Sequence, residues 1–394
     1  MGAKPVLNTA QRQTRLGRRH HLASAARAAS AVEVADGIVG LHATDPATVY
    51  LSLFARSQHP SVAQVESALY EDKTLLRMLG MRRTMFVVPT EFAPVVQAAC
   101  TRTIASRERR RSIQLFGPAG LADDTPTWLA AVEEQTFEAL AKRGKATAHQ
   151  LAEDIPALKR QVQVSPGKSY AGVISVCSRV LFQLSADGRI VRGRPRGTWI
   201  SGQYHWSPAT TWLRGGLPEI SPPTAQAALI ASWLRRFGPG TLADLRWWTG
   251  LTLGEVQRAL QAVQAVEVHL DEASGWIMED DLHAEAPCEP WVGLLPALDP
   301  TPMGYVDRAW FLGGHGTSIF DHTGNIGPSV WCDGRIVGGW AHRKDGTIAY
   351  KLLEDVGAEA ERVLESAAHD LGMLLGPVRV TPRFRTPLER ELSA

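Results

Sequence analysis

TAQAALIASWLRRFGPGTLADLRWWTGLTLGEVQRALQAVQAVEVHLDEASGWIMED, residues 224–280, holds three helical patterns followed by two short strand patterns. Apolar residues recur every three or four positions in the helical parts, and glycines at 238, 240 and 250 separate them. The expected elements are helices over 225–237, 241–250 and 251–263 and strands over 266–270 and 276–280. Three helices and a hairpin form a winged helix, a module that mostly places one helix in a groove of a nucleic acid.

Two further stretches repeat this order. Between 126 and 206, three helical patterns, the last over 170–188, precede strand patterns over 189–195 and 198–206. Residues 7–120 are mostly helical in pattern, but LLRMLGMRRTMFVVP at 75–89 predicts a hairpin. The helices expected before that hairpin cover Thr14–Ala29, Ala31–Gly40, Pro46–Ser57 and Ser61–Tyr70.

The sequence pattern changes after Pro287, where short β-rich runs are joined by Asp-Gly pairs typical of hairpin turns. A helix over Asp355–Leu375 and a last strand over 378–384 are expected to close the chain. The sequence therefore predicts an α+β fold of three tandem winged-helix modules and a small C-terminal β-sheet or barrel. The expected divisions are 1–120, 121–210, 220–284 and 285–394.

Composition limits the class of protein. No apolar run approaches the roughly 18 residues that span a bilayer, and the first residues do not resemble a signal peptide. Four scattered cysteines, without a CxxC pair, predict neither a zinc site nor a disulfide framework. We therefore expect a cytoplasmic protein without a metal or other cofactor.

Charge is unevenly distributed along the chain. Residues 1–120 hold 16 Lys and Arg against 8 Asp and Glu, whereas residues 121–394 hold 26 against 32. A basic first third on an otherwise acidic protein favours a polyanionic partner, although ordinary solvated helix faces would also give such a pattern.

Five stretches, in order, resemble the AlkZ/YcaQ family of bacterial winged-helix DNA glycosylases. They are GLHATDPATVYLSLFAR, LGMRRTMFVVPTEF, FGPGTLADLRWWTGLTLGEV, LLPALDPTPMGYVDRAWFL and NIGPSVWCDGRIVGGW. The resemblance implies modules wrapped around duplex DNA and hydrolysis of the N-glycosidic bond of bulky N7-alkylated purines, including crosslinks. It also implies a monomer without a protein partner, associated with the nucleoid.

The resemblance places the chemistry at a polar-apolar-polar triplet, which in this chain is His42-Ala43-Thr44 before Asp45-Pro46. The family has Gln at the first position and Gln or Asp at the third, so this chain departs from it at both. His42 could orient a water or, if protonated, act electrostatically, and Thr44 could hydrogen-bond that water. Asp45 is the nearest carboxylate, and it could instead cap the helix that begins at Pro46.

Three groups of residues are candidates for contact with DNA. Wing tips and runs of arginine suit phosphates, although such charges can also be solvated surface. The candidates are Arg82, Arg83 and Thr84 at the first hairpin tip, Arg107, Arg109, Arg110 and Arg111 on a helix, and Arg192, Arg194 and Arg196 in a wing.

Two classes of function remain open on the sequence. The first is a monofunctional glycosylase that uses water, because the triplet has no lysine for a Schiff base. The alternative is a winged-helix protein that binds DNA without catalysis, as a degenerate family member or a regulator.

Overall fold

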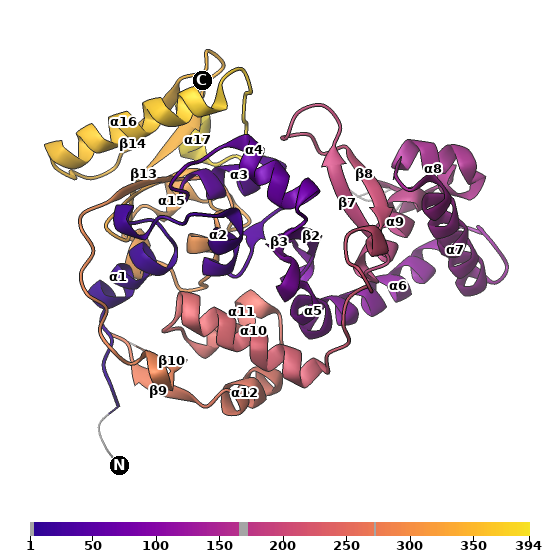
Figure 1. Ribbon diagram of the computed structural model, residues 1–394, viewed down its shortest axis with the longest axis horizontal. Coiled ribbons are helices and arrows are strands. Elements are labelled where there is room, and N and C mark those ends of the chain that lie inside the picture. The colour runs from indigo at the N-terminus through magenta and orange to yellow at the C-terminus, as the bar shows by residue number, and fades with distance from the viewer. Residues whose placement is uncertain (1–3, 165–171, 272) are drawn as a thin grey trace.

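The computed structural model describes residues 4–164, 172–271 and 273–394 of the chain. Helices alternate with small sheets (Figure 1), and each pair of the named strands is antiparallel, so the α+β class is confirmed. None of the helices within these residues is long and apolar enough to cross a membrane.

The first segment carries a three-stranded sheet in the order β1-β3-β2. Its elements are α1 (Thr9–Arg19), α2 (Ala31–Gly37), β1 (Leu41–His42), α3 (Pro46–Phe54), α4 (Val62–Glu66), β2 (Leu75–Leu79), β3 (Met85–Pro89), α5 (Ala93–Val96) and α6 (Arg102–Phe116). The predicted hairpin is confirmed. The helix expected over Thr14–Ala29 is wrong: α1 begins earlier, at an Asn8 capping box, and ends where His21 adopts a φ of 56°.

The second segment, at the right of Figure 1, has the sheet order β4-β8-β7. Its elements are α7 (Thr125–Arg143), β4 (Ala146–Thr147), α8 (Ala148–Asp154), β5 (Gln161–Val164), β6 (Gly172–Ser175), α9 (Val176–Ala186), β7 (Ile190–Pro195) and β8 (Tyr204–Pro208). The helix expected over 170–188 starts too early, because Val173 and Ile174 pair with β5 and Ser175 caps α9. Residues 170 and 171 of that prediction lie outside the described residues.

The third segment agrees most closely with its prediction. It comprises α10 (Pro222–Phe237), α11 (Leu242–Thr249), α12 (Leu253–Ala262), β9 (Ala265–His269) and β10 (Ser274–Met278). Capping boxes at Thr241 and Thr252 start α11 and α12, and Gly250 ends α11 at a φ of 74°. Gly240 forms an antiparallel bridge to Trp276 of β10, the second strand of this hairpin. In the other two sheets, β1 and β4 pair in the same way with the second strand of the hairpin. We interpret all three segments as winged helices on this shared order.

The C-terminal segment is an antiparallel meander in the order β11-β12-β13-β14. Its elements are β11 (Val292–Leu295), α13 (Pro300–Met303), α14 (Ala309–Leu312), α15 (Gly316–Ile319), β12 (Ser329–Cys332), β13 (Arg335–His342), β14 (Ile348–Leu352), α16 (Ala358–Leu375) and α17 (Pro387–Leu392). The last strand, expected over 378–384, does not form. Pro382 lacks the N–H group of a ladder, and the N–H groups of Val380 and Arg383 donate to the side chains of His342 and Asp45 instead.

One face of α3 is fastened to this C-terminal segment. Thr48 donates to the Ala297 carbonyl at 2.8 Å, one turn later Ser52 donates to Asp299 at 2.8 Å, and Arg56 follows one turn further on. The Arg56 guanidinium donates to both Asp299 carboxylate oxygens, at 2.8 and 2.6 Å, and both side chains are 0% exposed. This pair fixes the helix that follows the His42-Ala43-Thr44 triplet.

Replacing Asp299 with Ala would leave the Arg56 cation buried without a counter-charge. We expect Asp299→Ala to lower the free energy of unfolding by about 3–5 kcal/mol, measured by urea denaturation. Asp154→Ala is the control, since it removes the partner of Arg143 from an ion pair that is partly open to solvent. Equal effects of the two substitutions would contradict a special role for the buried pair.

Candidate active site

The triplet lies where β1 ends and α3 begins. His42 pairs with Phe86 of β3, and the Ala43 N–H donates to the Met85 carbonyl at 2.8 Å. Asp45 caps α3: one carboxylate oxygen accepts the Ala47 N–H, and the other accepts the Arg383 N–H, each at 3.0 Å. The capping interpretation of Asp45 fits this geometry, because both of its oxygens are engaged by backbone.

The His42 imidazole is buried at 7% exposure, with its ring centroid 5.8 Å from that of Phe86. Within the described residues neither ring nitrogen hydrogen-bonds to protein, and Nδ1 is fully enclosed. Burial lowers the pKa of His42 to about 3, and the positive charges of Arg82 and Arg77 add to this effect. His42 is therefore neutral near pH 7, which disfavours the protonated role considered from the sequence.

Thr44 is half-buried beside His42, and its backbone carbonyl accepts from the Arg383 guanidinium at 3.5 Å. The Thr44 hydroxyl forms no hydrogen bond within residues 4–164, 172–271 and 273–394. The Nε2 of His42, which is not among the enclosed atoms, and the hydroxyl of Thr44 thus leave hydrogen-bonding capacity for a water or a substrate group.

Arg77 is a site residue that the sequence analysis missed. Its side chain, 9% exposed, donates to the Ala43 carbonyl and to the Tyr204 hydroxyl of the second segment. It has no carboxylate partner in the described part of the chain, and its Nε is buried without a hydrogen bond. The available signal was a lone charge at the centre of the apolar strand LLRML.

The candidates for DNA contact at the tip of the first hairpin differ in their charge partners. Arg82 and Arg83 both adopt left-handed backbone angles, with φ of 52° and 62°. Arg83 forms an ion pair with Glu108 at 3.0 Å, whereas Arg82 lies 3.8 Å from the Trp247 ring centroid and has no ion pair in the described residues. Thr84 is half-buried, and its backbone closes the turn through Gly80 and Met81. Arg82 is therefore the member of this group whose charge remains available.

The other arginine candidates also divide into those that are paired with carboxylates and those that are not. Arg109 pairs with Glu133 at 2.5 Å and Asp187 at 2.6 Å, and Arg194 pairs with Glu66 and Glu71. Their charges are already balanced, which the sequence could not show because the carboxylates are distant along the chain. Arg107 and Arg110 on α6 and Arg196 on the β7–β8 hairpin are exposed and have no ion pair within the described residues, and Arg111 lies 4.0 Å from Glu108.

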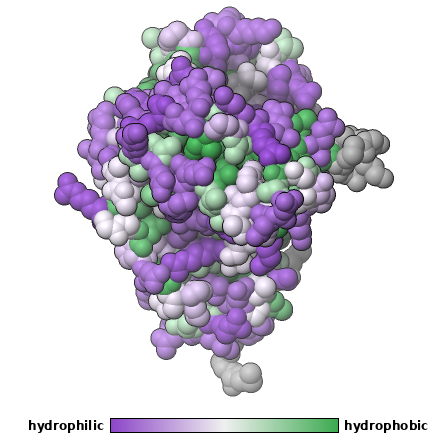
Figure 2. Space-filling view, turned by 90° about the vertical axis from the view of Figure 1, so that its right-hand side faces the viewer, coloured by the Kyte–Doolittle hydropathy of each residue, from purple (hydrophilic) through white to green (hydrophobic). Residues whose placement is uncertain are grey.

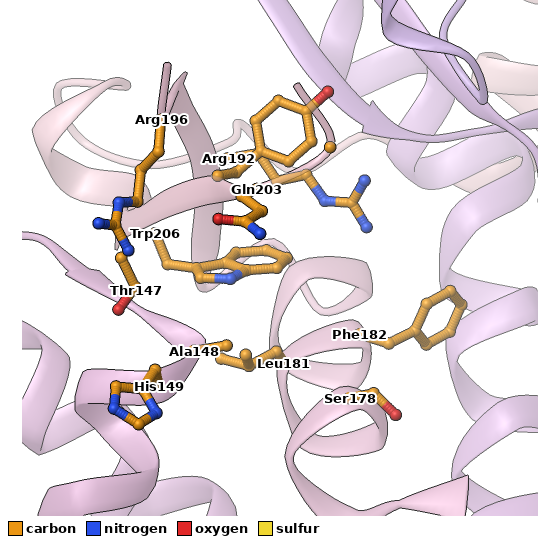
Figure 3. Close-up of a pocket in the computed structure, with 12 residues that line it drawn as sticks. Thr147, Ala148, His149, Ser178, Leu181, Phe182, Arg192, Arg196, Gln203 and Trp206 are labelled. Carbon is orange, nitrogen blue, oxygen red and sulfur yellow. The ribbon is translucent and has the colours of Figure 1, made fainter. Parts of the chain in front are cut away.

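Arg192 and Arg196 both line a cavity of about 520 Å³ in the second segment. Arg192 is the half-buried member of this pair, and Arg196 is exposed. Figure 3 shows Arg192 beside Gln203 and Trp206 on the hairpin, opposite Ser178 and Phe182 of α9. The surrounding surface is mostly hydrophilic when it is viewed from the side of the second segment (Figure 2). Of the three wing arginines, Arg192 and Arg196 therefore share the cavity, whereas Arg194 is paired with two glutamates.

Possible metal ligands were also compared with the structure. Among the residues that are described, no group of three or more His, Cys, Asp or Glu side chains could hold a metal ion. His20 is fully buried between Thr301 and the Arg236 carbonyl, and His315 bonds to Glu354. Both histidines have structural contacts.

The low pKa of His42 makes stability depend on pH. The unfolded chain binds a proton at His42 below about pH 6.5 and the folded protein does not, so falling pH favours unfolding. Relative to His42→Gln, we expect the wild type to lose roughly 1 kcal/mol of stability per pH unit between pH 6 and 4. Urea unfolding of both proteins at several pH values measures this, and a constant difference between them would contradict the assignment.

Comparison with known proteins identifies the family and the fold. A search of curated proteins gives no match, but the solved structure of Streptomyces sahachiroi DNA glycosylase AlkZ is similar, with a TM-score of 0.71 at 18% identity. The match covers 94% of this chain and 97% of that one. The family model described as "DNA glycosylase AlkZ-like" matches residues 35–374. This range is most of the chain and includes the triplet. The chain therefore belongs to the AlkZ-like DNA glycosylase family.

Proposed function

We propose that the protein hydrolyses the N-glycosidic bond of bulky N7-alkylated purines in duplex DNA, with water as the nucleophile. The observation that carries the proposal is the His42 ring, which has both nitrogens free of protein hydrogen bonds within the described residues and lies near unpaired arginines. The triplet stands at the position that the family resemblance assigns to the chemistry.

The chemistry of the substrate limits what the protein must provide. An N7-alkylated guanine already carries a positive charge, so its departure needs no general acid. The requirements are a positioned water and stabilisation of an oxocarbenium-like sugar. A neutral imidazole can accept a hydrogen bond from that water without adding a charge that opposes the sugar cation. The Thr44 hydroxyl can hold the same water, whereas Asp45 acts through the cap of α3.

The unpaired arginines fit a substrate with phosphates. Near a cationic sugar, Arg77 and Arg82 would raise the energy of the transition state if they stayed without counter-ions. Phosphates that bind to the exposed Arg82, or lie near the buried Arg77, reduce this cost and bring negative charge close to the sugar. The cations therefore favour a polyanionic substrate and do not favour a neutral small molecule.

The same reaction would unhook an interstrand crosslink, because cleavage of one N7-linked glycosidic bond frees one strand. We further propose that the protein acts as a monomer at the nucleoid, without a metal cofactor. The water takes the place of a lysine nucleophile, since the triplet contains none.

A second candidate function is DNA binding without catalysis. Two observations favour it: His42-Ala43-Thr44 departs from the family triplet at both polar positions, and both oxygens of Asp45, the nearest carboxylate, are engaged. A site without an available carboxylate lacks the strongest group for activating water. The two candidates differ in whether a base is released.

Base release distinguishes these functions. Purified protein is incubated, with a chelator present, with duplexes that carry a methyl, a bulky or a crosslinked N7 adduct, and free base is measured. We expect release of the bulky base, slowed at least about tenfold by His42→Ala because the water loses its partner. Arg143→Gln, on an outer ion pair, is the control. Tight binding of adducted DNA without release over hours would support the non-catalytic candidate, and full activity of His42→Ala would exclude His42 from the mechanism.

A further inference from the structure

The cavity of the second segment lies between the start of α8, one side of α9 and the β7–β8 hairpin. In Figure 3 the Trp206 indole crosses its centre, with Gln203 above it and Leu181 below it. Its volume of about 520 Å³ falls in the range of small-ligand sites. A duplex is too wide to enter such a space, whereas a single nucleotide fits.

Two arginines line this cavity, Arg192 and the exposed Arg196, and neither has an ion pair within the described residues. Arg192 is half-buried and forms neither an ion pair nor a side-chain hydrogen bond within the described residues, and its Nε is enclosed without a partner. Burial lowers the pKa of Arg192 to about 10, and the nearby charge of Arg77 contributes. By contrast, Arg194 on the same strand pairs with two glutamates, and Arg189 pairs with Glu134 at 2.8 Å. A half-buried cation beside a second cation needs an anion to balance it.

Aromatic rings accompany the charge. The Arg192 guanidinium lies 5.2 Å from the Trp206 ring centroid and 5.6 Å from that of Tyr204. Gln203 and Ser178 provide donors and acceptors at the cavity wall. Aromatic surface beside an unpaired arginine is the combination with which proteins bind unstacked nucleotides, through the face of the base and the phosphate.

The cavity is also connected to the triplet. The Arg77 guanidinium lies 4.5 Å from the Tyr204 ring centroid and donates to both the Tyr204 hydroxyl and the Ala43 carbonyl. One side chain therefore joins the cavity wall to the strand that carries His42. A DNA strand that passes the triplet would be brought close to the cavity.

We propose that this cavity binds one unstacked nucleotide of a DNA strand, with its phosphate on Arg192 and its base against Tyr204 and Trp206. The inference rests on the proposed function only in taking DNA as the polymer. It does not require that the nucleotide in the cavity is the one whose base is released.

The test compares two labelled duplexes by fluorescence anisotropy, one perfectly paired and one with a single unpaired nucleotide. Because stacking of one base adds roughly 1–3 kcal/mol, we expect the wild type to bind the bulged duplex about tenfold more tightly. Arg192→Gln should abolish this preference and lower the salt dependence of bulge binding by about one phosphate contact. Arg192→Lys should retain the salt dependence of bulge binding. Trp206→Leu should lower the preference for the bulged duplex without changing that salt dependence.

Arg189→Gln is the matched control, since it removes a paired arginine next to β7 and should leave the bulge preference unchanged. Circular dichroism confirms that each variant is folded. A wild type without bulge preference would overturn the inference, and so would an Arg192→Gln protein that keeps the preference. Base release is measured separately: loss of release with an intact Arg192-dependent preference rejects the proposed function alone, and the reverse result rejects the cavity assignment alone.

Discussion

The position of the candidate site depends on one buried ion pair, Arg56 with Asp299. Both charges are fully removed from solvent, which is costly unless the geometry satisfies them, and here two guanidinium bonds meet both carboxylate oxygens. The pair locks the far end of α3, while Asp45 and the Arg383 N–H hold its beginning. Because the triplet directly precedes α3, the C-terminal segment sets where His42 lies.

Two groups of arginines differ in their partners. Outer arginines such as Arg109 and Arg194 are paired with carboxylates from other helices and connect the segments. Arg77, Arg82 and Arg192 have no such partner within residues 4–164, 172–271 and 273–394 and gather near the triplet and the cavity. Although the net charge is only +2, these three positive charges lie where the proposed substrate would bind.

Local signals predicted much of the fold, because caps, glycines and apolar spacing act within a few residues. Thr241 and Thr252 start helices as their capping boxes require. Some helix boundaries failed for local reasons, but the partners of the site residues and the last strand failed for non-local ones. The partners of Arg109 lie 24 and 78 residues away, and the segment expected as a last strand binds Asp45, 338 residues away along the chain. Arg77 illustrates both limits: its odd place in an apolar strand is visible in the sequence, but its partners Ala43 and Tyr204 are not.

The shared guanidinium of Arg77 has a thermodynamic consequence. It spans two segments that contribute different surfaces, so a displacement of Tyr204 changes the bond that Arg77 makes to Ala43, and the reverse also holds. Coupling of this kind is reciprocal in free energy. A ligand bound in the cavity would therefore change the affinity of the triplet for its ligand, and binding at the triplet would change the affinity of the cavity by the same factor. The two surfaces would then bind a deformed DNA strand cooperatively.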